Sequence, residues 1–143
     1  ETYEWFDDNV DPDWSEQRHW AMELLGRAEE LAGIVQLLGV DALAPEERVT
    51  FVVAQMLRED FLQQSAYDEV DAYCPLEKQA WMLRVIRHFH DAAVSGVAEG
   101  VPIESISSAE VVATIGRMRR WPDTEVEDRG RQLIEQIDSE VTA

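Results

Sequence analysis

The sequence predicts an all-α protein, an antiparallel helical bundle of about five helices in a chain of 143 residues. Three observations favour this fold class. No segment of useful length alternates polar and apolar residues with the period of two that a half-buried strand requires. Apolar residues recur instead at steps of three and four, which is the spacing of a buried helix face. Residues typical of helix starts and ends separate these stretches.

The first two predicted helices form a hairpin. The first runs from Asp13 to about Leu38 and opens with a sequence typical of a capping box. Gly39 then stands where helices commonly end in glycine, and Pro45 stands at a first helical position, from which the second helix extends to about Leu62. The predicted buried faces of the two helices consist of Trp20, Leu24, Leu31, Val35 and Leu38, and of Val49, Val52, Val53, Met56 and Leu57.

Three more helices are predicted in the second half of the chain. The third runs from Pro75 to about Gly100, and Pro102 prevents its simple continuation. Capping-box sequences at 107–110 and 124–127 predict a fourth helix, which ends near Arg120, and a fifth. The buried residues of the third and fifth helices are predicted to be Leu76, Met82, Leu83, Ile86, Phe89, Ala93 and Val97, and Leu133, Ile134 and Ile137. Residues 1–12 are predicted to be a connector, and residues 13–143 the helical bundle domain.

The charge balance is strongly acidic, with 30 Asp and Glu residues against 12 Lys and Arg residues and a net charge of −18. Such a surface repels phosphate backbones and anionic lipids, so no nucleic-acid partner is predicted. No apolar run approaches the ~20 residues that span a bilayer, so no direct membrane insertion is predicted. Lys78 is the only lysine. Many carboxylates with almost no lysine predict a protein that works in concentrated salt, where charges are screened over ~3 Å at 1 M.

Residues with catalytic potential are sparse, and no catalytic residue is predicted. No glycine-rich phosphate-binding loop occurs in the chain. On a helix, His88 and His90 would point about 200° apart, so no shared metal site is predicted. Cys74 is alone, which excludes an internal disulfide and predicts a small buried residue. The basic cluster of Arg117, Arg119 and Arg120 is interpreted as stabilising the end of the fourth helix, with docking to an acidic neighbour as the alternative.

The segment from Ile34 to Tyr67 contains the hairpin, its acidic turn and a polar-aromatic stretch. From the residues alone, an ordinary capped helical corner is favoured over a working lever. One hypothesis is therefore a stand-alone acidic helical module that binds a cationic partner. A metal-dependent helical hydrolase would need histidines and carboxylates clustered on facing helices, and the histidine spacing argues against it.

The chain resembles the C-terminal helical domain of the catalytic A subunit of archaeal and vacuolar-type rotary ATP synthases, in a form suited to a salt-loving archaeon. The resemblance is carried by the segments 59–67 (EDFLQQSAY) and 69–79 (EVDAYCPLEKQ), with 9–14 (NVDPDW) upstream, and is densest from Val10 to Phe89. It implies that a nucleotide-binding domain precedes residue 1, so that the chain alone is inactive and holds no cofactor. The complete subunit would use ATP or ADP with Mg²⁺.

The resemblance also implies partners and a location. The complete subunit would couple ATP synthesis or hydrolysis to rotation of a central stalk and to ion transport. Its partners would be the B subunits of the catalytic hexamer and the central-stalk rotor subunits. The complex would lie at the cytoplasmic face of the cell membrane, with this domain peripheral to the membrane.

Two sets of site residues follow from the same resemblance. The turn of the hairpin would touch the rotor through Asp41, Leu43, Glu46 and Glu47. The adenine base would stack on Tyr67, with Phe61 and Tyr73 as supports. The family more often has Asn-Ala-Phe-His where this chain has Ser-Ala-Tyr-Asp at 65–68. Tyrosine keeps a stacking face, whereas Asp68 adds a negative charge near the pocket.

Overall fold

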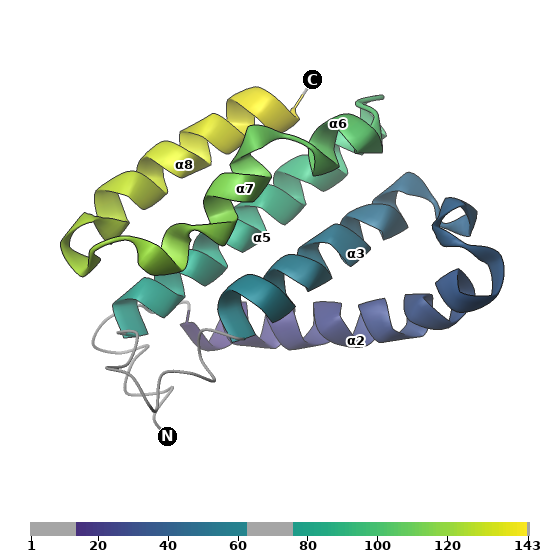
Figure 1. Ribbon diagram of the computed structural model, residues 1–143, viewed down its shortest axis with the longest axis horizontal. Coiled ribbons are helices and arrows are strands. Elements are labelled where there is room, and N and C mark those ends of the chain that lie inside the picture. The colour runs from purple at the N-terminus through teal and green to yellow at the C-terminus, as the bar shows by residue number, and fades with distance from the viewer. Residues whose placement is uncertain (1–13, 63–75, 143) are drawn as a thin grey trace.

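A computed structural model describes residues 14–62 and 76–142, and every regular element in these ranges is helical (Figure 1). The elements are α2 (Trp14–Leu38), the 3-10 helix η1 (Val40–Ala42), α3 (Pro45–Met56), the π-helix η2 (Leu57–Leu62), α5 (Leu76–Ala98), α6 (Ile103–Ser107), α7 (Glu110–Gly116), the 3-10 helices η3 (Met118–Arg120) and η4 (Asp123–Glu125), and α8 (Val126–Val141). The predicted all-α fold with about five helices is confirmed for the described residues. The predicted connector at 1–12 and the capping residue Asp13 lie outside the described residues.

Helices α2, α3 and α5 alternate in direction along the chain, and the short helix α7 runs back between α5 and α8 (Figure 1). The most extensive contact, however, joins two helices that run the same way, α5 and α8. A β-carbon added at Gly130 would lie 2.7 Å from Trp81 Cε3, and one added at Gly96 would lie 2.5 Å from the carbonyl oxygen of Val141. Glycine at these two positions therefore permits the close approach of α5 and α8.

The core lies between α5 and the other long helices. Its largest fully buried side chains are Trp14, Phe89, Leu31, Leu57, Met82, Leu83, Ile86, Ile106, Ile115, Met118 and Ile137. The predicted buried face of the third helix is confirmed for Met82, Leu83, Ile86, Phe89 and Ala93. Burial of this apolar surface is the main favourable contribution to folding.

Lys78, the only lysine of the chain, is buried, whereas lysine side chains are usually exposed to solvent. Its Nζ donates hydrogen bonds to the carbonyl oxygens of Arg119 at 2.6 Å and Trp121 at 2.7 Å. Asp123 Oδ1 lies 3.9 Å from the same nitrogen. Carbonyl oxygens at the end of a helix have no N–H donor from the same helix. The ammonium group supplies such donors, and it thereby connects the start of α5 to the turn between α7 and α8.

The predicted fourth helix at 107–120 is wrong in its boundaries. Pro102 is the N-cap of the short helix α6, and α7 begins only after Ala109. The hydroxyls of Ser107 and Ser108 donate back to the carbonyl oxygen of Glu104, at 3.4 Å and 2.8 Å, so they do not cap α7. Serine commonly competes with helix continuation in this way.

The caps of α7 and α8 also differ from the predicted capping boxes. Glu140 of α8 accepts a hydrogen bond from the backbone N–H of Val111 at 3.1 Å, so a residue distant in sequence stabilises the start of α7. The predicted box at 124–127 is absent, since α8 begins after Glu125 with no side-chain capping bond. Pro122 instead starts the 3-10 helix η4 in front of α8.

Candidate functional site at the end of the helical hairpin

The α2–α3 hairpin projects from the bundle, and its turn lies at the right-hand end of the molecule in Figure 1. Gly39 ends α2 with a φ of 90°, a conformation that favours glycine over residues with a side chain. Its N–H donates to the carbonyl oxygen of Val35 at 2.8 Å. The N–H of Leu43 donates to the carbonyl of Val40 at 3.1 Å, which closes the 3-10 helix η1. The turn is therefore hydrogen-bonded along its length.

The start of α3 is held by a carboxylate. Pro45 stands at its first position, where the missing N–H costs no helical hydrogen bond. Glu47 Oε1 accepts a hydrogen bond from the backbone N–H of Ala44 at 2.9 Å. Glu47 Oε2 lies 3.3 Å from Arg27 Nη2 on α2, so the same side chain ties the two helices together. Glu47 is thus engaged inside the hairpin.

The four side chains predicted to touch a rotor differ in accessibility. Asp41 and Glu46 are exposed, whereas Glu47 is half-buried. Leu43 is only 5% exposed. The placement of Leu43 at a contact surface is therefore corrected, because its side chain packs inside the turn and supports the hairpin from within. Asp41 and Glu46 remain available to a partner.

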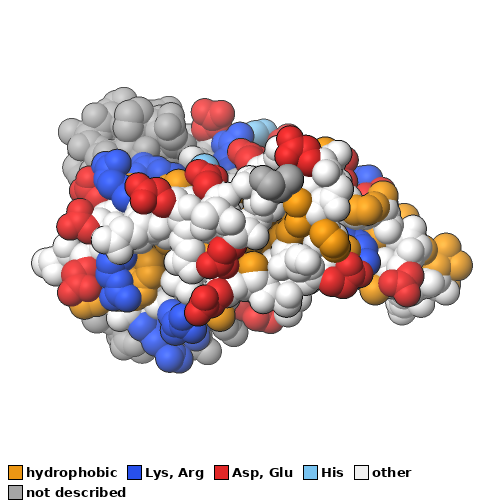
Figure 2. Space-filling view, turned by 90° about the horizontal axis from the view of Figure 1, so that it is seen from above, with side chains coloured by type: hydrophobic (Ala, Val, Ile, Leu, Met, Phe, Trp, Pro, Cys, Tyr) orange, Lys and Arg blue, Asp and Glu red, His pale blue; other side chains and the backbone are white. Residues whose placement is uncertain are grey.

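The end of the hairpin also has an exposed apolar surface, which the sequence did not predict. Leu37 and Leu38 are 84% and 72% exposed, and Ile34 and Val40 are each 40% exposed. We call these four residues the apolar tip. Figure 2 shows hydrophobic side chains at the narrow right-hand end of the molecule, where the hairpin turns. Leu38 was predicted to be buried because it continues the helical spacing of the stripe, and this prediction is wrong.

The reason for the exposure of Leu38 is geometric. The last turn of α2 extends further toward the end of the hairpin than the start of α3 does (Figure 1). No other helix of the described ranges reaches this end of the hairpin (Figure 1). The spacing of apolar residues marks a face of a helix, but it contains no information on how far the covering helix extends.

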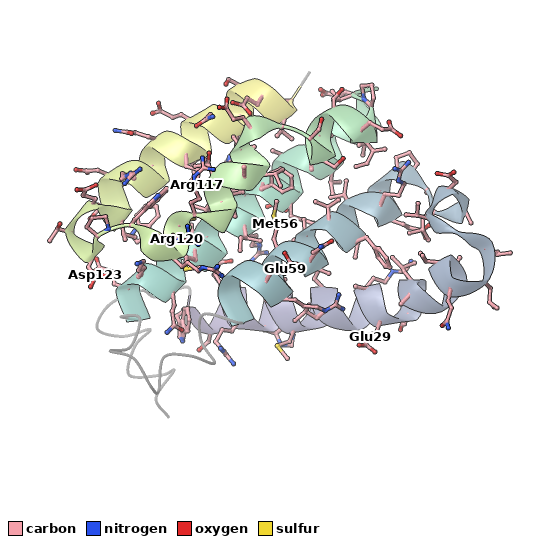
Figure 3. The ribbon with its side chains drawn as sticks, in the orientation of Figure 1. Glu29, Met56, Glu59, Arg117, Arg120 and Asp123 are labelled. Atoms are coloured by element: carbon pink, nitrogen blue, oxygen red, sulfur yellow. The ribbon has the colours of Figure 1, made fainter. Side chains whose placement is uncertain are left out.

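A hollow lies between α3 and the α6–α7 segment. It has a volume of about 380 Å³ and is lined by Val52, Gln55, Met56, Glu59, Ser107, Val112 and Gly116. Figure 3 shows Met56 and Glu59 on the α3–η2 side, and Arg117 and Arg120 on the side of α7 and η3. Gln55 Nε2 donates to Glu59 Oε2 at 3.0 Å. Ser107 Oγ donates instead to the carbonyl oxygen of Glu104 at 3.4 Å. The described polar side chains that line the hollow thus already have hydrogen-bond partners within the protein.

Two arginines of the basic cluster and the histidines at positions 88 and 90 have partners within the protein. Arg119 donates to the carbonyl oxygen of Glu59 in η2 at 3.2 Å, and Arg117 donates to Thr114 Oγ1 at 3.3 Å. His88 Nε2 lies 2.7 Å from Asp138 Oδ1 on α8, whereas His90 Nδ1 lies 3.0 Å from Asp91 Oδ1. The two imidazoles thus have different neighbours. Within 14–62 and 76–142, no three His, Cys, Asp or Glu residues are grouped to hold a metal.

The sequence of the hairpin and of the helix that follows it matches a known protein family. The C-terminal domain of V and A type ATP synthase matches residues 3–107, which include α2, α3, α5 and α6. The chain belongs to this family. The matched range covers most of the chain and contains the whole apolar tip.

Relatives of this ATP synthase domain come from several archaea. The A subunit of the A-type ATP synthase of Pyrococcus abyssi is 50% identical over 120 residues, which are 84% of the chain and 12% of that protein. The Methanopyrus kandleri protein of the same name is 45% identical over 136 residues, 95% of the chain and 23% of that protein. The protein of this name from Halobacterium salinarum is 41% identical over 133 residues, 93% of the chain and 23% of that protein. The chain spans less than a quarter of the length of these relatives.

The predicted adenine-binding residues of the ATP synthase domain lie at or beyond the end of η2. Phe61 is part of η2, and its side chain lies outside the described residues, as do Tyr67 and Tyr73. The second helix was predicted to continue as an α-helix to Leu62, whereas the structure changes to a π-helix at Leu57. Such π-helical turns occur often next to functional sites. The adenine pocket therefore stays a prediction.

The described helices were compared with the length and composition of a membrane-spanning helix. None of those in the described ranges combines the length and the apolar composition that a membrane span needs.

Proposed function

We propose that this chain is the lever of the catalytic subunit of an archaeal ATP synthase, which couples ATP synthesis or hydrolysis to rotation of a central stalk and thereby to ion transport. The observation that carries the proposal is the family match over residues 3–107, which coincides with a projecting, internally braced helical hairpin. Two packed helices transmit a displacement with little bending, since packed interfaces move as units. The reaction itself belongs to the nucleotide-binding part of the subunit.

The internal bonds of the hairpin support a rigid lever. Arg27 on α2 bridges to Glu47 on α3, and Glu47 caps the start of α3. Leu31 and Leu43 are buried near the end of the hairpin, at 1% and 5% exposure. A force applied at the turn would therefore reach the bundle through α2 and α3 without first unfolding the turn.

The proposed partners are the B subunits of the catalytic hexamer and the rotor subunits of the central stalk. The turn would face the stalk, with Asp41 and Glu46 accessible. The complete subunit would bind ATP or ADP with Mg²⁺, and its location would be peripheral, at the cytoplasmic face of the cell membrane. The archaeal relatives, each named as the A subunit of an A-type ATP synthase, support this assembly.

Cross-linking in the assembled complex tests the lever. Ala42 is exposed in η1, and an Ala42→Cys variant in a Cys74→Ser background places one thiol at the turn. We expect a disulfide to a cysteine introduced on a stalk subunit, formed under oxidising conditions, that stops rotation until a reductant cleaves it. Asp128→Cys, at the start of α8 and at the opposite end of the long axis, is the matched control. Equal stalk adducts from both positions, or none from the thiol at position 42, contradict the proposal.

The adenine contact needs its own test. We propose that Tyr67 stacks on the base, with Phe61 and Tyr73 as supports. In the complete subunit, Tyr67→Ala should raise the Kd for ADP roughly 5- to 150-fold, which corresponds to the 1–3 kcal/mol typical of base–aromatic stacking. Tyr67→Phe keeps the aromatic face and should restore binding to within about twofold. Identical Kd values for the alanine variant and the unaltered subunit contradict the assignment.

A further inference from the structure

We infer that the hairpin engages its partner through the apolar tip, and that its carboxylates contribute at the border of the contact rather than at its centre. The inference rests on the proposed lever function and names the chemistry of the partner. The complementary surface on the stalk would present aliphatic side chains, bordered by Lys or Arg residues. This arrangement follows the common anatomy of protein interfaces, an apolar centre with a polar rim.

The distribution of exposed apolar residues carries the inference. Five large hydrophobic side chains are exposed among the described residues, and four of them form the apolar tip. Ile34, Leu37 and Leu38 are spaced at three and four residues, so they share one side of the last turns of α2. Val40 adjoins them in η1. Single exposed apolar residues are ordinary on protein surfaces, but a contiguous group marks an interaction site.

The conformation of the tip is fixed before any partner binds. Leu31 and Leu43 are buried beside it, and Gly39 has the φ of 90° that turns the chain directly after Leu38. Leu37 and Leu38 are therefore presented on a supported helix end rather than on a loose loop. A pre-organised contact surface loses little conformational entropy on binding.

The carboxylates of the turn are less suited to the centre of the contact. Glu47 already accepts the hydrogen bond from Ala44 N–H and pairs with Arg27. Asp41 and Glu46 are exposed and have the accessibility that a border position requires. In salt near 1 M, exposed charges are screened over ~3 Å, so these carboxylates can add only weak, short-range ion pairs at the border of the contact.

A second copy of the chain does not fit this surface. Each copy carries a net charge of −18, so two tips would bring acidic borders together. A stable dimer also needs roughly 20–30 residues on each side, far more than the four of the tip. The same small area suits a contact that forms and breaks as the partner turns.

The test compares matched pairs of substitutions in the assembled complex, all carrying Ala42→Cys and Cys74→Ser. Leu37→Ser with Leu38→Ser removes the centre of the tip, and Asp41→Asn with Glu46→Gln neutralises its border. Met22→Ser is the control, because Met22 is 56% exposed on α2 but lies about three helical turns away from the tip. The readouts at 1 M KCl are the yield of the cross-link from position 42 to the stalk and the number of ions transported per ATP hydrolysed. The five positions that differ among the variants, 22, 37, 38, 41 and 46, are exposed to solvent, so each variant should unfold at the same temperature as the shared Ala42→Cys, Cys74→Ser background.

We expect the leucine pair to lower the cross-link yield and the coupling ratio about tenfold, since two leucines lose their burial against the stalk. The border pair should lower both by less than about threefold, and Met22→Ser by nothing measurable. The inference is overturned if the border pair has the larger effect, or if the leucine pair behaves like Met22→Ser. In either case, a cross-link from Ala42→Cys in the otherwise unaltered complex leaves the lever function standing. Absence of that cross-link refutes the lever itself.

Discussion

Gly130 on α8 faces the ring of Trp81 on α5 so closely that a β-carbon at position 130 would lie 2.7 Å from Trp81 Cε3. The ring is nearly buried, and the guanidinium carbon of Arg84 lies 4.2 Å from the ring centroid. The indole therefore has little room to move away. This contact holds the N-terminal parts of α5 and α8 together.

The contact predicts opposite effects for two glycine-to-alanine substitutions. Gly130→Ala should lower the free energy of unfolding by about 1–3 kcal/mol, because overpacking outweighs the gain in helix propensity. Gly26→Ala on α2 is the control, since a β-carbon at Gly26 meets nothing within 4 Å. It should stabilise the domain by about 0.5–1 kcal/mol. Chemical denaturation measures both values, and a stabilising Gly130→Ala would show that the helices can separate freely.

Lys78 provides a second prediction about stability. Replacement by Met keeps most of the side-chain volume but leaves the carbonyls of Arg119 and Trp121 without their donor. We expect a loss of about 2–3 kcal/mol, as is typical when buried groups lose hydrogen bonds to a charged partner. Arg120→Met removes an exposed cation from the same turn and should change stability by less than about 0.5 kcal/mol. Similar losses for both variants would mean that net charge, not the buried bonds, determines stability here.

Two substitutions of Glu47 distinguish the contribution of helix capping to stability from that of the ion pair with Arg27. Glu47→Ala removes both the bond to Ala44 N–H and the pair with Arg27, at an expected cost of about 1 kcal/mol. Glu47→Gln keeps an acceptor oxygen for Ala44 and loses only the exposed ion pair, so its cost should be a few tenths of a kcal/mol. Amide hydrogen exchange at Ala44 gives a local measurement. Faster exchange in the alanine variant alone is the expected pattern, and equal exchange in both variants would contradict the capping role.

The acidic composition predicts a melting temperature that rises with salt. With 30 acidic and 12 basic residues, self-repulsion destabilises the folded chain in dilute buffer. The Debye length falls from ~30 Å at 0.01 M to ~8 Å at 0.15 M, so most of the gain from screening should appear below that concentration. Each kcal/mol gained raises the melting temperature by about 4 °C in a domain of this size.

A KCl titration followed by circular dichroism checks this prediction. A further rise above 1 M would indicate that salt also strengthens apolar burial, since screening is nearly complete there. A melting temperature that is the same in dilute buffer and in molar salt would refute the adaptation to concentrated salt.

Much of the fold could be predicted because the signals are local. Gly39 and Pro45 mark the turn of the hairpin, and the residues between Met82 and Ala93 mark the buried face of α5 by their spacing. Errors arose where a distant residue decides the outcome. The start of α7 is capped by Glu140, which lies 29 positions further along the chain than Val111, rather than by the nearby serines.

The candidate site was predicted in part. The turn of the hairpin was identified, and Asp41 and Glu46 are accessible there. Leu43 was expected outside and Leu38 inside, whereas the structure has them the other way round. Both side chains are aliphatic, so composition and spacing could not distinguish a leucine that supports the turn from one that is available to a partner.

Periodicity, glycine, proline and residue identity are properties of short segments, so the helices, the hairpin, the acidic surface and the family could be predicted from the sequence. The exposed apolar residues of the hairpin end, the carboxylate that pairs across the hairpin and the burial of Lys78 follow only from the packing of distant segments. Burial depends on where neighbouring helices end, and that is not a property of a short segment. The last turn of α2 extends past the start of α3, and no other helix of the described part of the chain covers Leu37 and Leu38.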